Sequence, residues 1–163
     1  MARRRSFEEM NCSIARALDV IGEWWTLLVV REAFRGVRRF DGFVERLGIA
    51  PNILTARLRR LVEHGVLEER AYQDRPPRVE YRLTAKGRDL YPVIVSLLGW
   101  GDRWYAEDGP PVDLIHAECG RRANPQLVCG HCGEKLDARN TRAVPGRGAG
   151  EPEPSLVVSG SAS

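Results

Sequence analysis

The sequence predicts a mainly α-helical domain with a single β-hairpin, followed by a separate cysteine-containing segment. Three observations lead to this prediction. Apolar residues recur with the helical period of 3.6 through residues 11–65 and again over 85–105. Between these stretches, residues 66–83 change to the strand period of 2. After residue 105 both periodicities end, and Cys119, Cys129 and Cys132 lie close together.

Composition and charge are those of a soluble globular protein. The 163 residues, 43% hydrophobic and 29% charged, suit one domain with appendages. No apolar run is long enough to span a membrane, and the N-terminal Met-Ala-Arg-Arg-Arg lacks the apolar stretch of a signal peptide. We therefore expect a cytoplasmic location and no membrane partner. Residues 1–105 carry 19 basic and 14 acidic side chains, whereas residues 106–163 carry 6 and 8, so the basic groups gather in the folded part.

The first fifty residues are expected to form three helices, each ended by a glycine: residues 12–21, 23–35 and 38–48. Asn11 is the expected N-cap of the first helix. Only Ile49 and Ala50 separate the third helix from a fourth. A short helix, a tight turn with glycine and a helix with a polar outer face make the helix-turn-helix pattern.

The fourth helix, residues 51–64, is the one around which the domain is organised. Leu54, Leu58 and Leu61 fall on one face, Pro51 suits the first turn and Gly65 is placed to end the helix. Arginine and asparagine can read base edges in a major groove, and threonine can hold a phosphate. The opposite face and its flanks carry the candidate DNA contacts Asn52, Thr55, Arg57, Arg59 and Arg60. The alternative is an ordinary solvated face.

Residues 66–83 predict a β-hairpin with strands over 66–72 and 79–83 and a proline-rich tip. Placed directly after a DNA-reading helix, such a hairpin is the wing of a winged-helix domain. The alternative is an ordinary exposed hairpin. Arg75 and Arg78 at the tip are candidates for the minor groove or the adjacent backbone. Arg38 and Arg39, at the start of the third helix, are candidates for clamping a phosphate.

The last helix, residues 85–105, is expected to begin at Thr84 as its cap and to bend or split near Tyr91, because Pro92 cannot continue it. Its apolar residues are too many for one stripe on a small domain. We expect the excess to be buried against a second subunit. The alternative is packing on the domain's own first helix. A homodimer would supply two reading helices for a palindromic operator in double-stranded DNA.

Composition also divides the chain. Residues 1–10 are expected to be a basic N-terminal arm, 11–105 the DNA-binding and dimerisation domain, and 106–111 a hinge. Residues 112–137 are expected to form a small Cys/His-containing element, and 138–163 a disordered tail rich in glycine, proline and serine. No internal repeat is evident along the chain.

Together these features resemble the HxlR-type winged helix-turn-helix transcriptional regulators, which are related to the MarR type. The resemblance covers residues 11–105 and rests on six motifs in order: residues 12–18, 22–28, 39–40, 54–61, 77–84 and 99–104. It implies a homodimeric, sequence-specific DNA-binding protein with no enzymatic activity. One departure is Trp24, which stands before Trp25 where the family usually has a basic residue.

The cysteines raise two further hypotheses. Cys12, in the first turn of the first helix, is a redox-sensing candidate, because helix N-termini favour the thiolate and several members of the family sense oxidants there. The alternative is a buried, inert thiol. In the small element, the set His116, Cys119, Cys129 and Cys132 has the paired spacing of ligands for one structural Zn²⁺. A redox pair of Cys129 and Cys132, or a tail with chance cysteines, are the alternatives.

The predicted function is therefore sequence-specific transcription regulation, as a repressor. Its activity would be controlled through Cys12, through a small ligand of unknown identity, or by neither. The rival hypothesis is a metal- or redox-dependent protein-interaction module built on a winged-helix scaffold. Exposed arginines on the fourth helix favour the DNA reader.

Overall fold

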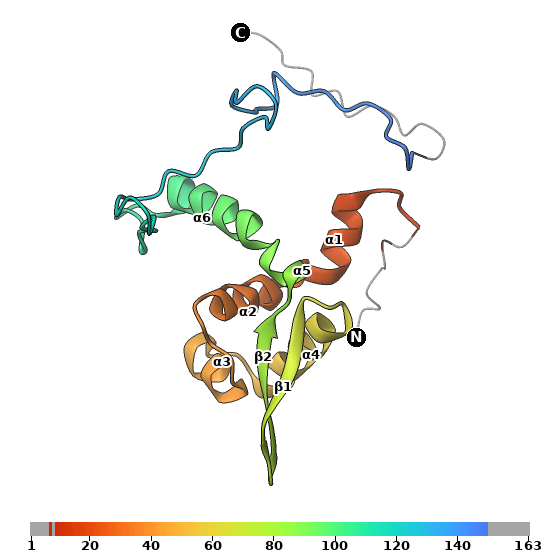
Figure 1. Ribbon diagram of the computed structural model, residues 1–163, viewed down its shortest axis with the longest axis vertical. Helices are drawn as coiled ribbons and strands as arrows, with labels where there is room; N and C mark the ends of the chain where they lie inside the picture. The colour runs from red at the N-terminus through yellow and green to blue at the C-terminus, as the bar shows by residue number, and fades with distance from the viewer. Residues whose placement is uncertain (1–6, 8, 150–163) are drawn as a thin grey trace. The chain divides into compact units, whose positions relative to one another are not determined.

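The computed structural model describes residues 7 and 9–149, which divide between two compact units, Met1–Tyr105 and Ala106–Ser163. Six helices and one hairpin make up the first unit as the structure describes it (Figure 1). Their order is α1 (Ser13–Ile21), α2 (Trp24–Phe34), α3 (Phe40–Leu47), α4 (Pro51–Glu63), β1 (Leu67–Asp74), β2 (Pro77–Leu83), α5 (Ala85–Arg88) and α6 (Tyr91–Tyr105). The fold is thus mainly helical with one hairpin, as the sequence predicts.

The turn between α3 and α4 follows the expected chemistry. Gly48 caps α3 in the left-handed conformation, with φ of 61°, which side chains with a Cβ rarely adopt. Pro51 then occupies the first turn of α4, where its missing N–H costs no hydrogen bond. At the other end His64 caps α4, and Gly65 turns the chain away with φ of 66°.

Several expected element ends differ from the structure. α3 begins at Phe40, with Arg39 as its N-cap, rather than at Arg38. The N-cap of α1 is Cys12 rather than Asn11, and no side chain caps the helix there. The strands of the hairpin run further than predicted, to Asp74 and from Pro77, because backbone pairing continues through the polar residues next to the turn. Side-chain alternation marks only the half-buried part of a strand, so it underestimates strand length at an exposed tip.

The hairpin is antiparallel and pairs Leu67 with Leu83 at its base and Asp74 with Pro77 at its tip. Its register shifts between Ala71 and Gln73, so that Tyr72 lies at a bulge. A bulge bends the strand and re-aims a side chain. In Figure 1 the hairpin extends beyond the helices that surround its base.

The last predicted helix is split, as Pro92 indicates. The Thr84 hydroxyl accepts a hydrogen bond from the Gly87 N–H and so caps the short α5. After Asp89 and Leu90 the chain restarts as α6, with Pro92 in its first turn, where the ring displaces no helical hydrogen bond. Of the two predicted outcomes, a bend or a split, the structure has the split.

One core holds the first unit together. It joins α2, α3, α4 and the base of β1 through nine residues of at most 2% exposure: Val29, Val30, Phe43, Ile49, Leu54, Leu58, Leu61, Val66 and Leu67. The three leucines of α4 lie in this core, so the helix face that the sequence assigns to the interior is confirmed. The other face of α4 is consequently turned outward.

The second unit has little regular structure as described. Two isolated antiparallel bridges, Ile115 with Arg122 and Val128 with Lys135, mark two tight turns. Most of the predicted arm 1–10, and residues 150–163 of the predicted tail, lie outside the described residues. Across the helices that are described, none has both the length and the apolar character needed to cross a membrane.

Candidate nucleic-acid interface

Three of the predicted DNA contacts are exposed on the outward face of α4: Asn52, Thr55 and Arg59. The Arg59 Nε donates to Glu63 Oε1 at 2.7 Å, one helical turn on, and its side chain is 79% exposed. Such an exposed pair is weak, about 0.3–0.5 kcal/mol, so the guanidinium can exchange the carboxylate for a base or a phosphate. The Thr55 hydroxyl already donates to the Pro51 carbonyl at 2.8 Å, which leaves its oxygen as an acceptor on this face.

Two arginines of α4 lie differently from the expected outer face. Arg60 is half-buried, and its Nε donates to the backbone carbonyl of Asp19 at 2.9 Å, a bond that its Nη2 duplicates. Arg57 is only 21% exposed and pairs with Glu23 at 3.3 Å. Helical spacing shows that both residues lie outside the buried leucine face of α4. It does not show that α1 and the start of α2 cover the side of the helix on which they lie. These two guanidinium groups are therefore held against the protein.

The hairpin is tied to the segment before α3 through Arg39. Its guanidinium carbon lies 4.5 Å from the ring centre of Tyr72, and its Nε lies 3.5 Å from Glu80 Oε1. The Tyr81 N–H also donates to the Arg38 carbonyl at 2.8 Å. The Arg39 side chain is 62% exposed despite these contacts, and Arg38 is exposed as well. The two expected phosphate clamps therefore lie beside the hairpin, on accessible side chains.

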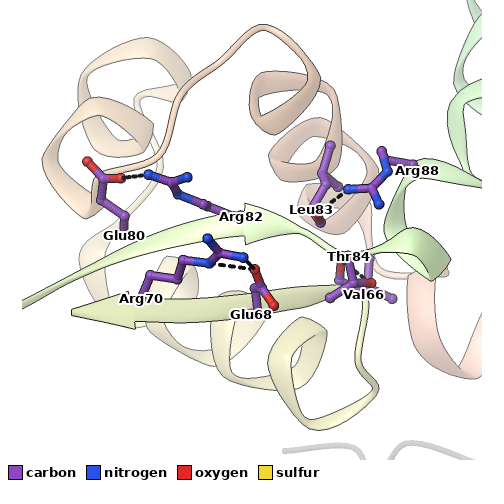
Figure 2. Close-up of polar contacts among 8 residues, drawn as sticks. All are labelled: Val66, Glu68, Arg70, Glu80, Arg82, Leu83, Thr84 and Arg88. Atoms are coloured by element: carbon purple, nitrogen blue, oxygen red, sulfur yellow. Dashed lines mark hydrogen bonds and ion pairs between the residues drawn. The ribbon is translucent and has the colours of Figure 1, made fainter. Parts of the chain in front are cut away.

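Polar contacts also stiffen the hairpin (Figure 2). Arg82 donates to Glu80 at 3.0 Å on one strand, and Arg70 donates to Glu68 at 2.8 Å on the other. The Arg82 hydrogen bond holds the pKa of the Glu80 carboxyl below its usual range, and the charges of Arg39 and Arg38 lower it further. In the strands, the carboxylates of Glu68 and Glu80 are thus each paired with an arginine.

The tip of the hairpin carries Arg75 and Arg78, and both are exposed. Their charges are carried beyond the helices because the strands continue to Asp74 and Pro77 (Figure 1). The arginines expected at the wing tip are therefore displayed at the end of a long, paired hairpin.

The cysteines fall into two environments. Cys12 is half-buried at the N-cap of α1. In the second unit, His116 Nδ1 lies 3.4 Å from Cys119 Sγ. Hydrogen bonds from the backbone N–H groups of Cys132 and His131 hold the pKa of the Cys129 thiol below its usual range. The structure brings the four predicted zinc ligands together as two pairs; over residues 7 and 9–149, no cluster of three or more His, Cys, Asp or Glu side chains is positioned to hold a metal ion.

Sequence reasoning missed one buried charge. Glu32, on α2, is 1% exposed and receives hydrogen bonds from Arg31 at 2.9 Å and Arg35 at 3.1 Å, with Arg46 of α3 at 3.8 Å. From the sequence, a glutamate between arginines on a helix is predicted to be exposed to solvent. The sequence does not show that a residue of another helix, here Arg46, lies close to it. The charge cluster joins α2 to α3.

Large apolar side chains are exposed on α1 and α6. They are Ile14 at 70% and Leu18 at 44% on α1, and Val93, Leu97, Trp100, Trp104 and Tyr105 at 44–73% on α6. None of the described α6 residues is buried. Trp24, at the start of α2, is 91% exposed. These side chains leave a large apolar surface on the domain, on elements other than the face of α4.

Comparison with known proteins agrees with this arrangement. The model of the HxlR-like helix-turn-helix family matches residues 20–109. The HTH-type transcriptional regulator Rv3095 of Mycobacterium tuberculosis is 50% identical over 137 residues, which cover 83% of this chain and 87% of the relative. The regulator sll1512 of Synechocystis is 37% identical over 108 residues, 66% of this chain and 80% of its own.

Solved structures are similar too. PA1607, a proposed transcription factor, is 42% identical, with a TM-score of 0.77 over 86% of this chain and 99% of its own. The reduced form of the redox regulator HypR is 33% identical, with a TM-score of 0.54 over 60% of this chain and 99% of its own. The helices, the hairpin and these matches make the fold a winged helix-turn-helix. The chain belongs to the HxlR-like helix-turn-helix family of transcriptional regulators.

Proposed function

We propose that the protein is a homodimeric repressor that reads a palindromic operator in double-stranded DNA. The observation that carries the proposal is the exposed polar face of α4, with Asn52, Thr55 and Arg59, beside a hairpin that displays Arg75 and Arg78. A helix of this kind enters a major groove, and a basic hairpin reaches the neighbouring minor groove or backbone.

Within this proposal the polar side chains have different roles. Arg59 and Asn52 read base edges, since each can make a bidentate contact with a base. Arg75 and Arg78 at the tip, with Arg38 and Arg39 beside the hairpin, hold phosphates and fix the register of the protein on the duplex. Arg57 lies at the edge of the contact and must leave Glu23 to take part.

The homodimer is supported by the apolar surface of α1 and α6. Side chains such as Leu97, Trp100 and Trp104 stay 49–62% exposed, although burying one large apolar side chain stabilises by about 1.5–3 kcal/mol. We propose a second copy of the chain as the occupant, because a two-fold pair of α4 helices matches a palindrome. A protein bound to an operator prevents other proteins from binding the same DNA. Repression by this means requires no further activity of the bound protein.

A thiol response is a second part of the proposal. HypR, which is similar to this chain, is described as a redox regulator. Cys12 lies at the N-cap of α1, next to the apolar surface, where oxidation would change the end of a dimerising helix.

The test is a selection of genomic DNA fragments by the purified full chain at a stated salt concentration, with and without a thiol reductant. A palindromic site with half-sites about one helical turn apart supports the dimeric reader. Recovery of only salt-sensitive, sequence-blind binding contradicts it. Loss of binding on oxidation in the parent, but not in Cys12→Ser, supports the thiol response, and equal behaviour of the two proteins contradicts that part alone.

A further inference from the structure

The second unit contains the same turn twice. In the first copy, the His116 N–H donates to the Arg121 carbonyl at 2.9 Å, and the Gly120 N–H donates to the His116 carbonyl at 2.8 Å. In the second copy, the N–H of Cys129 donates to Glu134 at 2.8 Å, and that of Gly133 donates to Cys129 at 2.8 Å. Each donor and each acceptor of the second copy lies thirteen residues after its counterpart in the first copy.

The agreement extends beyond these bonds. Each turn ends in a further backbone bond, from Ala123 to Leu114 at 2.6 Å and from Leu136 to Leu127 at 2.8 Å. Each also contains one antiparallel bridge at the same offset. The glycines at equivalent positions, 120 and 133, both have positive φ, 64° and 75°. The expectation that the chain has no internal repeat is therefore wrong at this point. Few side chains are shared between the copies, so the backbone shows the repeat more clearly than the sequence does.

The four predicted zinc ligands lie at equivalent positions in the two turns. His116 and Cys119 occupy in the first turn the places that Cys129 and Cys132 occupy in the second. Bond lengths of about 2.3 Å for Zn–S and about 2.0–2.1 Å for Zn–N, at a tetrahedral angle, set the two ligand atoms about 3.6 Å apart. His116 Nδ1 and Cys119 Sγ lie 3.4 Å apart, so the first turn already holds its pair at the bite of one ion.

We infer that the two turns are the halves of one Zn²⁺ site, with His116, Cys119, Cys129 and Cys132 as its four ligands. Three thiolates and one imidazole form a closed tetrahedral set of the structural type. In the structure as described the pairs are separate, and binding of the ion would bring them together. Ten residue steps separate Cys119 from Cys129, a reach of about 33 Å when extended, so the connection allows the two turns to face each other.

Exposed apolar groups agree with such a closure. Ile115, Leu127 and Val128, next to the ligand pairs, are 60%, 69% and 47% exposed. The described residues of the second unit include no buried side chain, so the turns have no core of their own. When a segment lacks a core, a metal supplies the contact that fixes its fold. Bringing the turns together around Zn²⁺ would also cover these apolar side chains.

The test uses the full chain without a polyhistidine tag, kept under reductant and loaded with Zn²⁺. Metal per chain is measured by mass spectrometry after gel filtration, and Co²⁺ replaces Zn²⁺ for visible absorption. We expect one metal ion per chain and the absorption of a tetrahedral Co²⁺ site with three thiolates. Ellman's reagent should then react quickly with one of the four cysteines, Cys12, and with all four after a chelator is added.

Matched variants separate the ligands from their neighbours. Cys132→Ser and His116→Ala should each reduce bound metal at least about tenfold. His131→Ala removes an imidazole from the same turn but from a position that is not a ligand, and Cys12→Ser removes the cysteine of α1, so both should keep one ion per chain. The helical circular dichroism of the first unit checks that each variant is folded, since that unit has its own core.

Three results on the parent protein, and one on a variant, overturn the inference. The first is that the protein retains no metal and that all four cysteine thiols react with Ellman's reagent. Another is half an ion per chain, which indicates a site shared between two chains. The third is a disulfide between Cys129 and Cys132 that excludes metal under the same reductant. Loss of the ion in His131→Ala contradicts the assignment of the ligands.

Discussion

Replacing Arg60 by methionine tests how the structure divides the arginines of α4. Arg60 donates twice to the Asp19 carbonyl, in the last turn of α1, where helical carbonyls have no partner within the helix. A hydrogen bond from a charged donor contributes about 1.5–3 kcal/mol. Because both bonds share one acceptor and the side chain is half-buried, we expect the lower end, about 1.5 kcal/mol. Methionine keeps the aliphatic stem, so the difference reports the polar contact.

The assay is thermal unfolding at a fixed protein concentration, followed by binding to the selected operator. For a unit of this size about 1.5 kcal/mol lowers the Tm by roughly 6–12 °C. Arg59→Met is the matched control on the same helix; it loses an exposed pair of about 0.3–0.5 kcal/mol and should barely move the Tm. An unchanged Tm in Arg60→Met, together with relaxed choice at one base pair, would refute the reasoning and return Arg60 to the DNA face.

Three further predictions concern the interface and its support. Arg59→Ala should reduce the discrimination at one base pair by about 1–3 kcal/mol. Arg78→Ala should instead weaken binding to all DNA sequences alike and lower the slope of log K against log salt by about 0.9. Titrations on operator and mismatched DNA at several salt concentrations distinguish the two effects. Gly87→Ala should cost about 2–3 kcal/mol of unfolding free energy in a denaturant titration, because its Cβ would overlap the Val66 carbonyl, and a smaller loss would contradict the close approach. Since the pKa of Glu80 lies below its ordinary value of 4.5, its contribution to stability is present above that pH and is lost as the pH falls through the lowered pKa. The protection of hairpin amides from exchange, relative to their intrinsic rates, should fall in that acid range, and Glu80→Gln should lack this step.

The sequence predicts the elements well where one physical signal decides them. The leucine spacing of α4, the proline in its first turn and the glycine after it are local signals, and all three agree with the structure. Pro92 likewise predicts the break before α6, because a missing N–H acts within one turn. Local chemistry is enough to place these elements.

The candidate site is predicted less completely because its side chains depend on contacts distant in sequence. Arg60 and Asp19 are 41 residues apart, and no helical pattern shows that they meet. Glu32 is buried where α2 and α3 meet, and Tyr72, at the bulge of β1, contacts Arg39, which is 33 residues earlier in the chain. Whether an arginine faces DNA or its own protein is decided by tertiary packing, which helical periodicity does not report.

The repeated turn has an evolutionary consequence. Each copy closes the same set of backbone hydrogen bonds within itself, so a tandem duplication of thirteen codons adds a complete turn without needing a new partner elsewhere in the chain. Such a duplication leaves the first unit unchanged, because all nine buried residues of its core lie between Val29 and Leu67. The second unit can therefore change in length without disturbing the packing of the helices and the hairpin.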